Sequence, residues 1–128
     1  MTKLVIIPAF IMVLIIMPDA LPAQGIGITS GGTIAITGAA TIEINDGGLV
    51  NNGTYTKGTE TMTFSGSTAQ TVSGTNNLDM NSLSITNTGG LTTQLTLLTT
   101  VNLAIGAGSK FTILTAKAVT VSTSLANN

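Results

Sequence analysis

Residues 26–44 read IGITSGGTIAITGAATIEI. Isoleucines stand two positions apart in this stretch, and the pairs recur every eight residues, at Ile26/Ile28, Ile34/Ile36 and Ile42/Ile44. Successive side chains of a strand point to opposite faces, so each pair lies on one face while Thr, Ala or Glu turns outward between its members. Glycines between the pairs are typical of turns. The stretch therefore predicts short, half-buried strands joined by turns.

The same spacing returns toward the other end of the chain. The pairs there are Leu95/Leu97, Leu103/Ile105, Phe111/Ile113 and Val119/Val121. The middle keeps the pattern less cleanly, with Met62/Phe64, Val72, Leu78/Met80 and Leu83/Ile85. No window after residue 24 has the apolar spacing of an amphipathic helix, and its many Thr and Asn residues oppose one. These patterns predict an all-β chain.

Two all-β architectures fit short strands at this spacing. In a β-solenoid, three eight-residue sides make a rung of about 24 residues, so residues 24–128 form four to five rungs. In a β-sandwich or meander, consecutive strands pair as hairpins. A sandwich usually fills the gap between its sheets with several large aromatic side chains, and residues 24–128 contain only Tyr55, Phe64 and Phe111. We therefore expect a single β-solenoid over residues 24–128, with the sandwich or meander as the alternative.

Residues 1–23 differ in kind from the rest of the chain. Lys3 precedes an apolar run from Leu4 to Met17, and Pro18 and Asp19 interrupt its extension. The run is shorter than the roughly 20 apolar residues that a membrane span needs. A basic start, a short apolar run and a region of small residues are typical of a secretory signal peptide. We predict a signal peptide over residues 1–23, cleavage near Ala23 and a secreted or cell-surface protein.

One phrase in the middle of the chain is similar to a known repeat. It consists of GLVNNGTYT at 48–56, TMTFSGSTAQTVSG at 61–74 and LSITN at 83–87. This phrase resembles repeats in large secreted surface proteins of Bacteroidota, which are similar to the β-helical stalks of filamentous-haemagglutinin-type adhesins. The resemblance covers about residues 46–105. It implies export, a right-handed β-helix and a surface or adhesive role. Members of that family are usually far longer and carry a C-terminal sorting domain, so two explanations are open: the chain is truncated at its C-terminus, or it associates end to end or edge to edge.

The composition excludes several classes of function. The chain is 7% charged with a formal net charge of -1, and it has no His, Cys or Arg. So few cations cannot neutralise several phosphates, so we expect no nucleic-acid partner. The missing side chains exclude thiol and His-based catalysis and most transition-metal sites. The acids after residue 24 are scattered and are interpreted as solubility and edge-protecting charges: Glu43, Asp46, Glu60 and Asp79. We predict a non-enzymatic protein with no catalytic residue, cofactor or metal.

The local motifs are interpreted as turns and not as ligand-binding sites. Asp46-Gly47-Gly48 is a turn, since calcium needs six to eight oxygens, which commonly include several carboxylates. Asn52-Gly53 is likewise a turn dipeptide. Tyr55 is the one speculative binding residue, because a tyrosine ring can stack on a sugar.

Three functional hypotheses follow. The first is an exported structural or adhesin-type surface protein, a β-helical stalk or spacer. The second is a small extracellular carbohydrate-binding module with a surface glycan as its partner. The third is a subunit of an extracellular filament or matrix that self-associates through an exposed terminal rung, since Val119–Leu125 ends the chain on a strand edge able to pair. After signal cleavage we expect no membrane contact.

Overall fold

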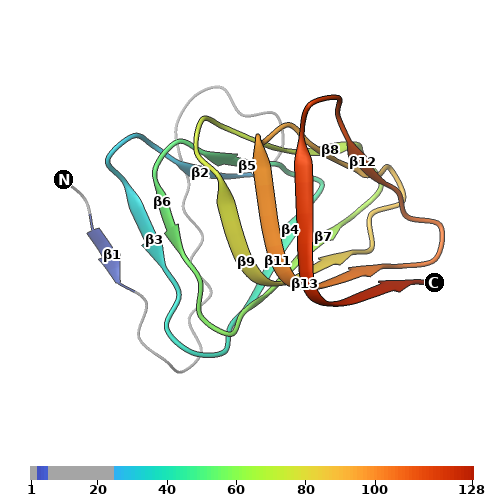
Figure 1. Cartoon of the computed structure of the whole chain (residues 1–128), viewed down its shortest axis with the longest axis horizontal. Helices are drawn as coiled ribbons and strands as arrows, with labels where there is room; N and C mark the ends of the chain where they lie inside the picture. The colour runs from blue at the N-terminus through green and yellow to red at the C-terminus, as the bar shows by residue number, and fades with distance from the viewer. Residues whose placement is uncertain (1–2, 6–24) are drawn as a thin grey trace.

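The computed structural model describes residues 3–5 and 25–128, which form strands and turns without a helix (Figure 1). The strands are β1 Lys3–Val5, β2 Ile26–Ile28, β3 Thr33–Ala35, β4 Thr41–Asn45, β5 Leu49–Asn51, β6 Thr54–Thr56, β7 Thr61–Ser65, β8 Gln70–Ser73, β9 Leu78–Ile85, β10 Leu91–Thr93, β11 Leu97–Ile105, β12 Phe111–Ile113 and β13 Ala118–Asn127. Apart from Lys3–Val5, the predicted signal peptide lies outside the described residues.

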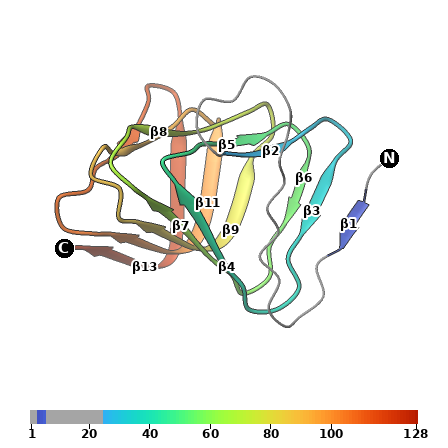
Figure 2. The same ribbon diagram turned by 180° about the vertical axis from the view of Figure 1, so that it is seen from behind.

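Residues 25–128 coil through five rungs, and every strand pair among the described residues is parallel. One sheet has the order β12-β10-β8-β5-β2, and a second has the order β13-β11-β9-β7-β4. On the remaining side, β3 pairs with β6, and β1 adds to the free edge of β3. We number the sides in chain order, so that β2 and β5 lie on the first side, β3 and β6 on the second, and β4 and β7 on the third. Strands that lie side by side thus belong to successive rungs, as β9, β11 and β13 do in both views (Figures 1 and 2). Hairpins of a sandwich or meander would be antiparallel, so the predicted β-solenoid is confirmed.

We number the rungs by the strands that they contain. Rung 1 is residues 26–45, rung 2 is 49–65, rung 3 is 70–85, rung 4 is 91–105 and rung 5 is 111–127. Partner residues of neighbouring rungs lie 20 apart between Thr41 and Thr61, and 23 apart between Ile26 and Leu49. The spacing varies because the corners differ in length, and between β11 and β13 the register also shifts by one residue between Thr100 and Asn102.

The core is a set of apolar columns that run from rung to rung. Ile44, Phe64, Ile85 and Ile105 occupy equivalent positions of rungs 1 to 4. Phe64 is fully buried in the middle of this column. Each rung is too thin to bury its own apolar side chains, so it depends on the rungs above and below. The predicted pairs of rung 1 do mark its three sides, because each pair has at least one residue in a different strand, β2, β3 or β4.

One predicted pair is wrong. Leu95 and Leu97 do not share the inner face, since Leu95 and Leu98 are the buried residues and Leu97 is half-buried. A corner lies between Leu95 and the inward positions of β11, and it breaks the alternation that a continuous strand would keep.

Candidate functional site

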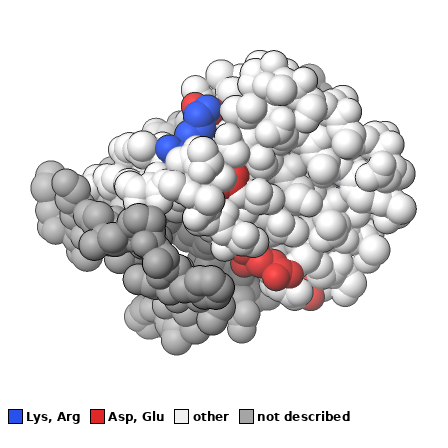
Figure 3. Space-filling view, turned by 90° about the horizontal axis from the view of Figure 1, so that it is seen from below, with Lys and Arg blue, Asp and Glu red and all other residues white. Residues whose placement is uncertain are grey.

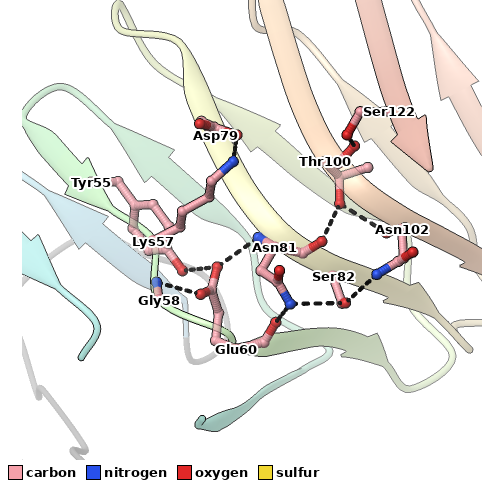
Figure 4. A network of polar contacts seen from close by, with 10 residues as sticks. All are labelled: Tyr55, Lys57, Gly58, Glu60, Asp79, Asn81, Ser82, Thr100, Asn102 and Ser122. Carbon is pink, nitrogen blue, oxygen red and sulfur yellow. Dashed lines mark hydrogen bonds and ion pairs between the residues drawn. The ribbon is translucent and has the colours of Figure 1, made fainter. Parts of the chain in front are cut away.

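A polar cluster occupies the corner between the second and third sides of the solenoid (Figure 4). Glu60, the last residue before β7, is fully buried. Its Oε1 accepts hydrogen bonds from the Tyr55 hydroxyl at 3.0 Å and from the Asn81 amide at 2.9 Å. Its Oε2 accepts one from the Gly58 amide at 2.8 Å. The carboxylate therefore joins rung 2 to rung 3.

The cluster continues into the next two rungs. The Asn81 side-chain amide donates to the Glu60 carbonyl at 3.2 Å and to the Ser82 hydroxyl at 3.2 Å. Asn102 in turn donates to Ser82 at 3.2 Å, and its oxygen accepts from Ser124 at 2.8 Å. These contacts form a ladder of side chains from rung 2 to rung 5, which we call the corner ladder.

Tyr55 belongs to this structural cluster. Its ring is half-buried and packs against the apolar core, while its hydroxyl is bonded to Glu60. Burial raises the pKa of Tyr55 above its usual value of 10.0, and the neighbouring charge of Glu60 and the hydrogen bond to it act in the same direction. Sugar stacking at Tyr55 stays a prediction.

The corner between the first and second sides is joined by asparagines. Asn51 is fully buried, and its Nδ2 donates to the Asn77 carbonyl at 2.8 Å. Asn52 Oδ1 accepts from the Thr75 amide at 3.0 Å. Gly74 adopts a φ of +127° directly against the Asn51 backbone, where a side chain would collide. The dipeptide at Asn52 is therefore a corner, as predicted, but its side chain also joins two rungs.

The corner that leads into the first side of the next rung holds two buried amides. Gln70 Nε2 donates to the Ile44 carbonyl at 2.8 Å. Asn87 is fully buried, and its Nδ2 donates to the Thr68 carbonyl at 2.7 Å and to Gln70 Oε1. Buried amides without partners are costly, so these bonds specify how the rungs stack.

Asp46 joins rungs 1 and 2 at the start of the same corner. It has a φ of +53°, which confirms the predicted turn. Its Oδ1 accepts from the amides of Ser67 at 2.7 Å and Thr68 at 2.8 Å, and from the Thr68 hydroxyl at 3.0 Å. The Thr68 and Ser67 amides hold the pKa of Asp46 below its usual 3.8, because they favour the charged carboxylate.

Acid is expected to weaken the Asp46 corner. The pKa of Asp46 is lowered in the folded chain, so its stabilisation is present above the unfolded pKa and is lost as pH falls through the lower folded value. Urea unfolding of the parent and of Asp46→Asn should therefore differ most at pH 7, and the difference should shrink below about pH 4. Glu43→Gln removes one formal charge from the same rung and is the control. A parent-to-variant difference that does not change with pH would contradict the assignment.

The remaining charges are scattered over the surface. Lys57 Nζ lies 2.7 Å from Asp79 Oδ1, and both side chains are substantially exposed, so this ion pair adds little stability. Figure 3 shows a face on which charged side chains are isolated among uncharged ones. Within the described part of the chain, acidic residues do not gather in a group of three that could hold a metal ion. A membrane-crossing helix is absent from residues 3–5 and 25–128.

The structure corrects one interpretation of the acids. Glu43 and Asp79 are exposed and Asp46 is half-exposed, as solubility charges would be. Glu60 is not a surface charge, because it is fully buried and hydrogen-bonded at a corner. The sequence reasoning also missed the buried amides of Asn51, Gln70 and Asn87, for which it assigned no role. A signal that could have found them is the spacing to their partners, which lie 17 to 26 residues away, about one rung along the chain.

The chain matches no protein-family model, no curated protein and no solved structure. The resemblance to Bacteroidota surface repeats therefore stays a prediction that rests on its motif.

Proposed function

We propose that the protein is an exported structural protein that serves as a β-solenoid stalk or spacer in an extracellular or cell-surface assembly. The observation that supports this most is how the polar side chains are used. Glu60, Asn51, Gln70 and Asn87 are buried, and each bonds to a neighbouring rung or corner. The buried polar groups of the chain thus hold one rung on the next.

Such a coil has a defined length. Parallel strands lie about 4.8 Å apart, so five rungs extend about 24 Å along the axis. Each rung contacts only its neighbours, so length follows from the number of rungs and the cross-section stays constant. A protein that holds other groups at a set distance needs this geometry and needs no catalytic site.

The outer face of the third side suits an extracellular spacer. Thr63, Ser84, Ala104 and Ala126 follow one another there in register. These side chains are small and uncharged, so they form an even surface over rungs 2 to 5, and the exposed Glu43 occupies the same column in rung 1. The predicted leader over residues 1–23 supplies the route out of the cell.

Export is tested by following the full chain in its source organism. We expect it in the medium or on the cell surface, digestible by protease added to intact cells, with a new N-terminus near Gln24 found by mass spectrometry. Leu14→Arg places a charge in the apolar run and should retain the protein inside, whereas Leu14→Val should be exported normally. An uncleaved parent protein in the soluble cell interior would refute the proposal.

A further inference from the structure

The two ends of the solenoid expose strand edges of the same kind. At one end, β12 and β13 are edge strands, and at the other β2 and β4 are edge strands. The large apolar side chains that lie exposed in the described residues all belong to the rung 5 end: Ile113 at 47%, Leu114 at 42% and Leu125 at 63%. A rung whose apolar side chains stay exposed lacks the neighbour that the inner rungs have.

The apolar columns show what would fit on rung 5. Leu125 ends the column that begins at Ile42, and Ile113 ends the column that begins at Ile26. Ile26 and Ile42 are themselves only half-buried. Rung 1 of a second copy would place its Ile42 over Leu125 and its Ile26 over Ile113. This contact repeats the one that already joins the rungs within the chain.

Strand direction also favours this occupant. All pairs within the solenoid are parallel, so a second copy in the same orientation continues each sheet without reversing it. The free edge of rung 1 does accept a parallel strand, since β1 pairs there with β3. Two rung 5 ends facing each other would instead meet in antiparallel register.

The formal charges of the two ends are opposite. Residues 26–48, which are rung 1 and the corner after it, contain two acids, Glu43 and Asp46, and no lysine, whereas residues 106–128 contain two lysines, Lys110 and Lys117, and no acid. Unlike charges at the two ends attract when rung 5 meets rung 1, and like charges repel when two identical ends meet.

From these observations we infer that a second copy of this chain docks head to tail, with its rung 1 on rung 5 of the first. The contact joins different surfaces of the two copies and does not close on itself, so it propagates into a filament. The docking adds a partner to the proposed stalk function and rests on one part of it, the removal of residues 1–23, because β1 otherwise pairs at the β3 edge of rung 1.

The test uses residues 24–128, which contain the whole described core from Ile28 to Leu103 and leave the β3 edge free. Sedimentation velocity should show a mass that grows with protein concentration. Electron microscopy should show rods of constant width that lengthen by about 24 Å per copy.

Proline variants block one end at a time. The Asp46 amide donates to the Ser65 carbonyl, and the Ala40 carbonyl accepts from the Thr61 amide, so the even-numbered residues of this strand bond to rung 2. Backbone groups alternate in direction along a strand, so the amide of Glu43 points to the open edge of rung 1. Asn128 donates to Ile105, so Leu125 directs its amide to the open edge of rung 5. Glu43→Pro and Leu125→Pro therefore remove an edge donor without breaking a backbone bond between rungs. Glu43→Pro also removes the carboxylate that accepts from the Ser65 hydroxyl, and so does its control Glu43→Thr, so this loss is the same in both. Glu43→Thr and Leu125→Val keep the amide and are the matched controls.

Each proline variant alone should stay monomeric, and both controls should assemble. A mixture of the two proline variants should give one-to-one dimers and stop there, because it offers one open head and one open tail. Circular dichroism of each variant checks that the β-structure is retained. A parent that stays monomeric at every concentration, proline variants that assemble like the parent, or a mixture that forms no dimer would each overturn the inference.

Discussion

Glu60→Ala is expected to lower the free energy of unfolding by about 3–5 kcal/mol, because it leaves several donors without their buried acceptor. These donors are the Tyr55 hydroxyl and the amides of Gly58 and Asn81. Total stability of a domain is about 5–15 kcal/mol, so the loss is a large share of it. Urea unfolding followed by circular dichroism measures it. Tyr55 is the one tyrosine and the chain has no tryptophan, so tyrosine emission reports on this corner directly.

Two control variants distinguish the effect of removing the buried acceptor at Glu60 from the effect of removing any acid. Glu60→Gln keeps the shape and one acceptor oxygen, so it should cost about 1–3 kcal/mol. Glu43→Ala removes an exposed acid whose carboxylate accepts a hydrogen bond from the Ser65 hydroxyl, and it should stay within about 0.5 kcal/mol of the parent. Equal losses for Glu60→Ala and Glu43→Ala would show that Glu60 does not join the rungs.

Phe64→Ala is expected to lower the free energy of unfolding by about 3–5 kcal/mol, because it leaves a cavity at a fully buried site between Ile44 and Ile85. The neighbouring rungs cannot close the cavity without breaking the backbone hydrogen bonds that join β7 to β4 and β9. Differential scanning calorimetry measures the drop in the unfolding temperature, and urea unfolding gives the free energy.

The control for this cavity lies in the last rung. Phe111 is half-buried and β12 is an edge strand, so Phe111→Ala should cost clearly less than Phe64→Ala. The same side-chain deletion thus tests whether stability is concentrated in the inner rungs. Similar losses at the two positions would argue against that gradient.

Much of the fold could be predicted because its main signal is local. The isoleucine pairs of residues 26–44 mark three successive sides, and each pair is set by neighbours two positions apart. The signal fails where a corner changes length. Leu95 and Leu97 have strand spacing, yet a corner separates Leu95 from β11. Periodicity assumes an unbroken strand, and the sequence alone does not show where the backbone bends.

The polar corners were harder to predict because their partners are distant in sequence. Glu60 looks like a surface acid until rung 3 brings the Asn81 amide to it, 21 residues later. Asn87 looks like a turn residue until it is placed against Thr68 and Gln70. Burial of a polar group depends on rung register, which is settled by the whole coil and not by nearby residues. Asp46 was the exception, since the glycines that follow it already marked a turn.

The position of Glu60 has a mechanical consequence. Four residues separate β6 from β7 at its corner, whereas β9 and β11 pass the same corner as continuous strands. A pulling force on the C-terminus would detach β13 from β11, and then β11 from β9. Glu60 would then resist, because three hydrogen bonds from rung 3 end on it and must break before rung 3 separates from rung 2. The Asn81 amide donates to its carboxylate, and the Asn81 side chain and the Ser82 amide donate to its carbonyl. Under tension, the chain should therefore unravel in steps and pause with rungs 1 to 3 still wound.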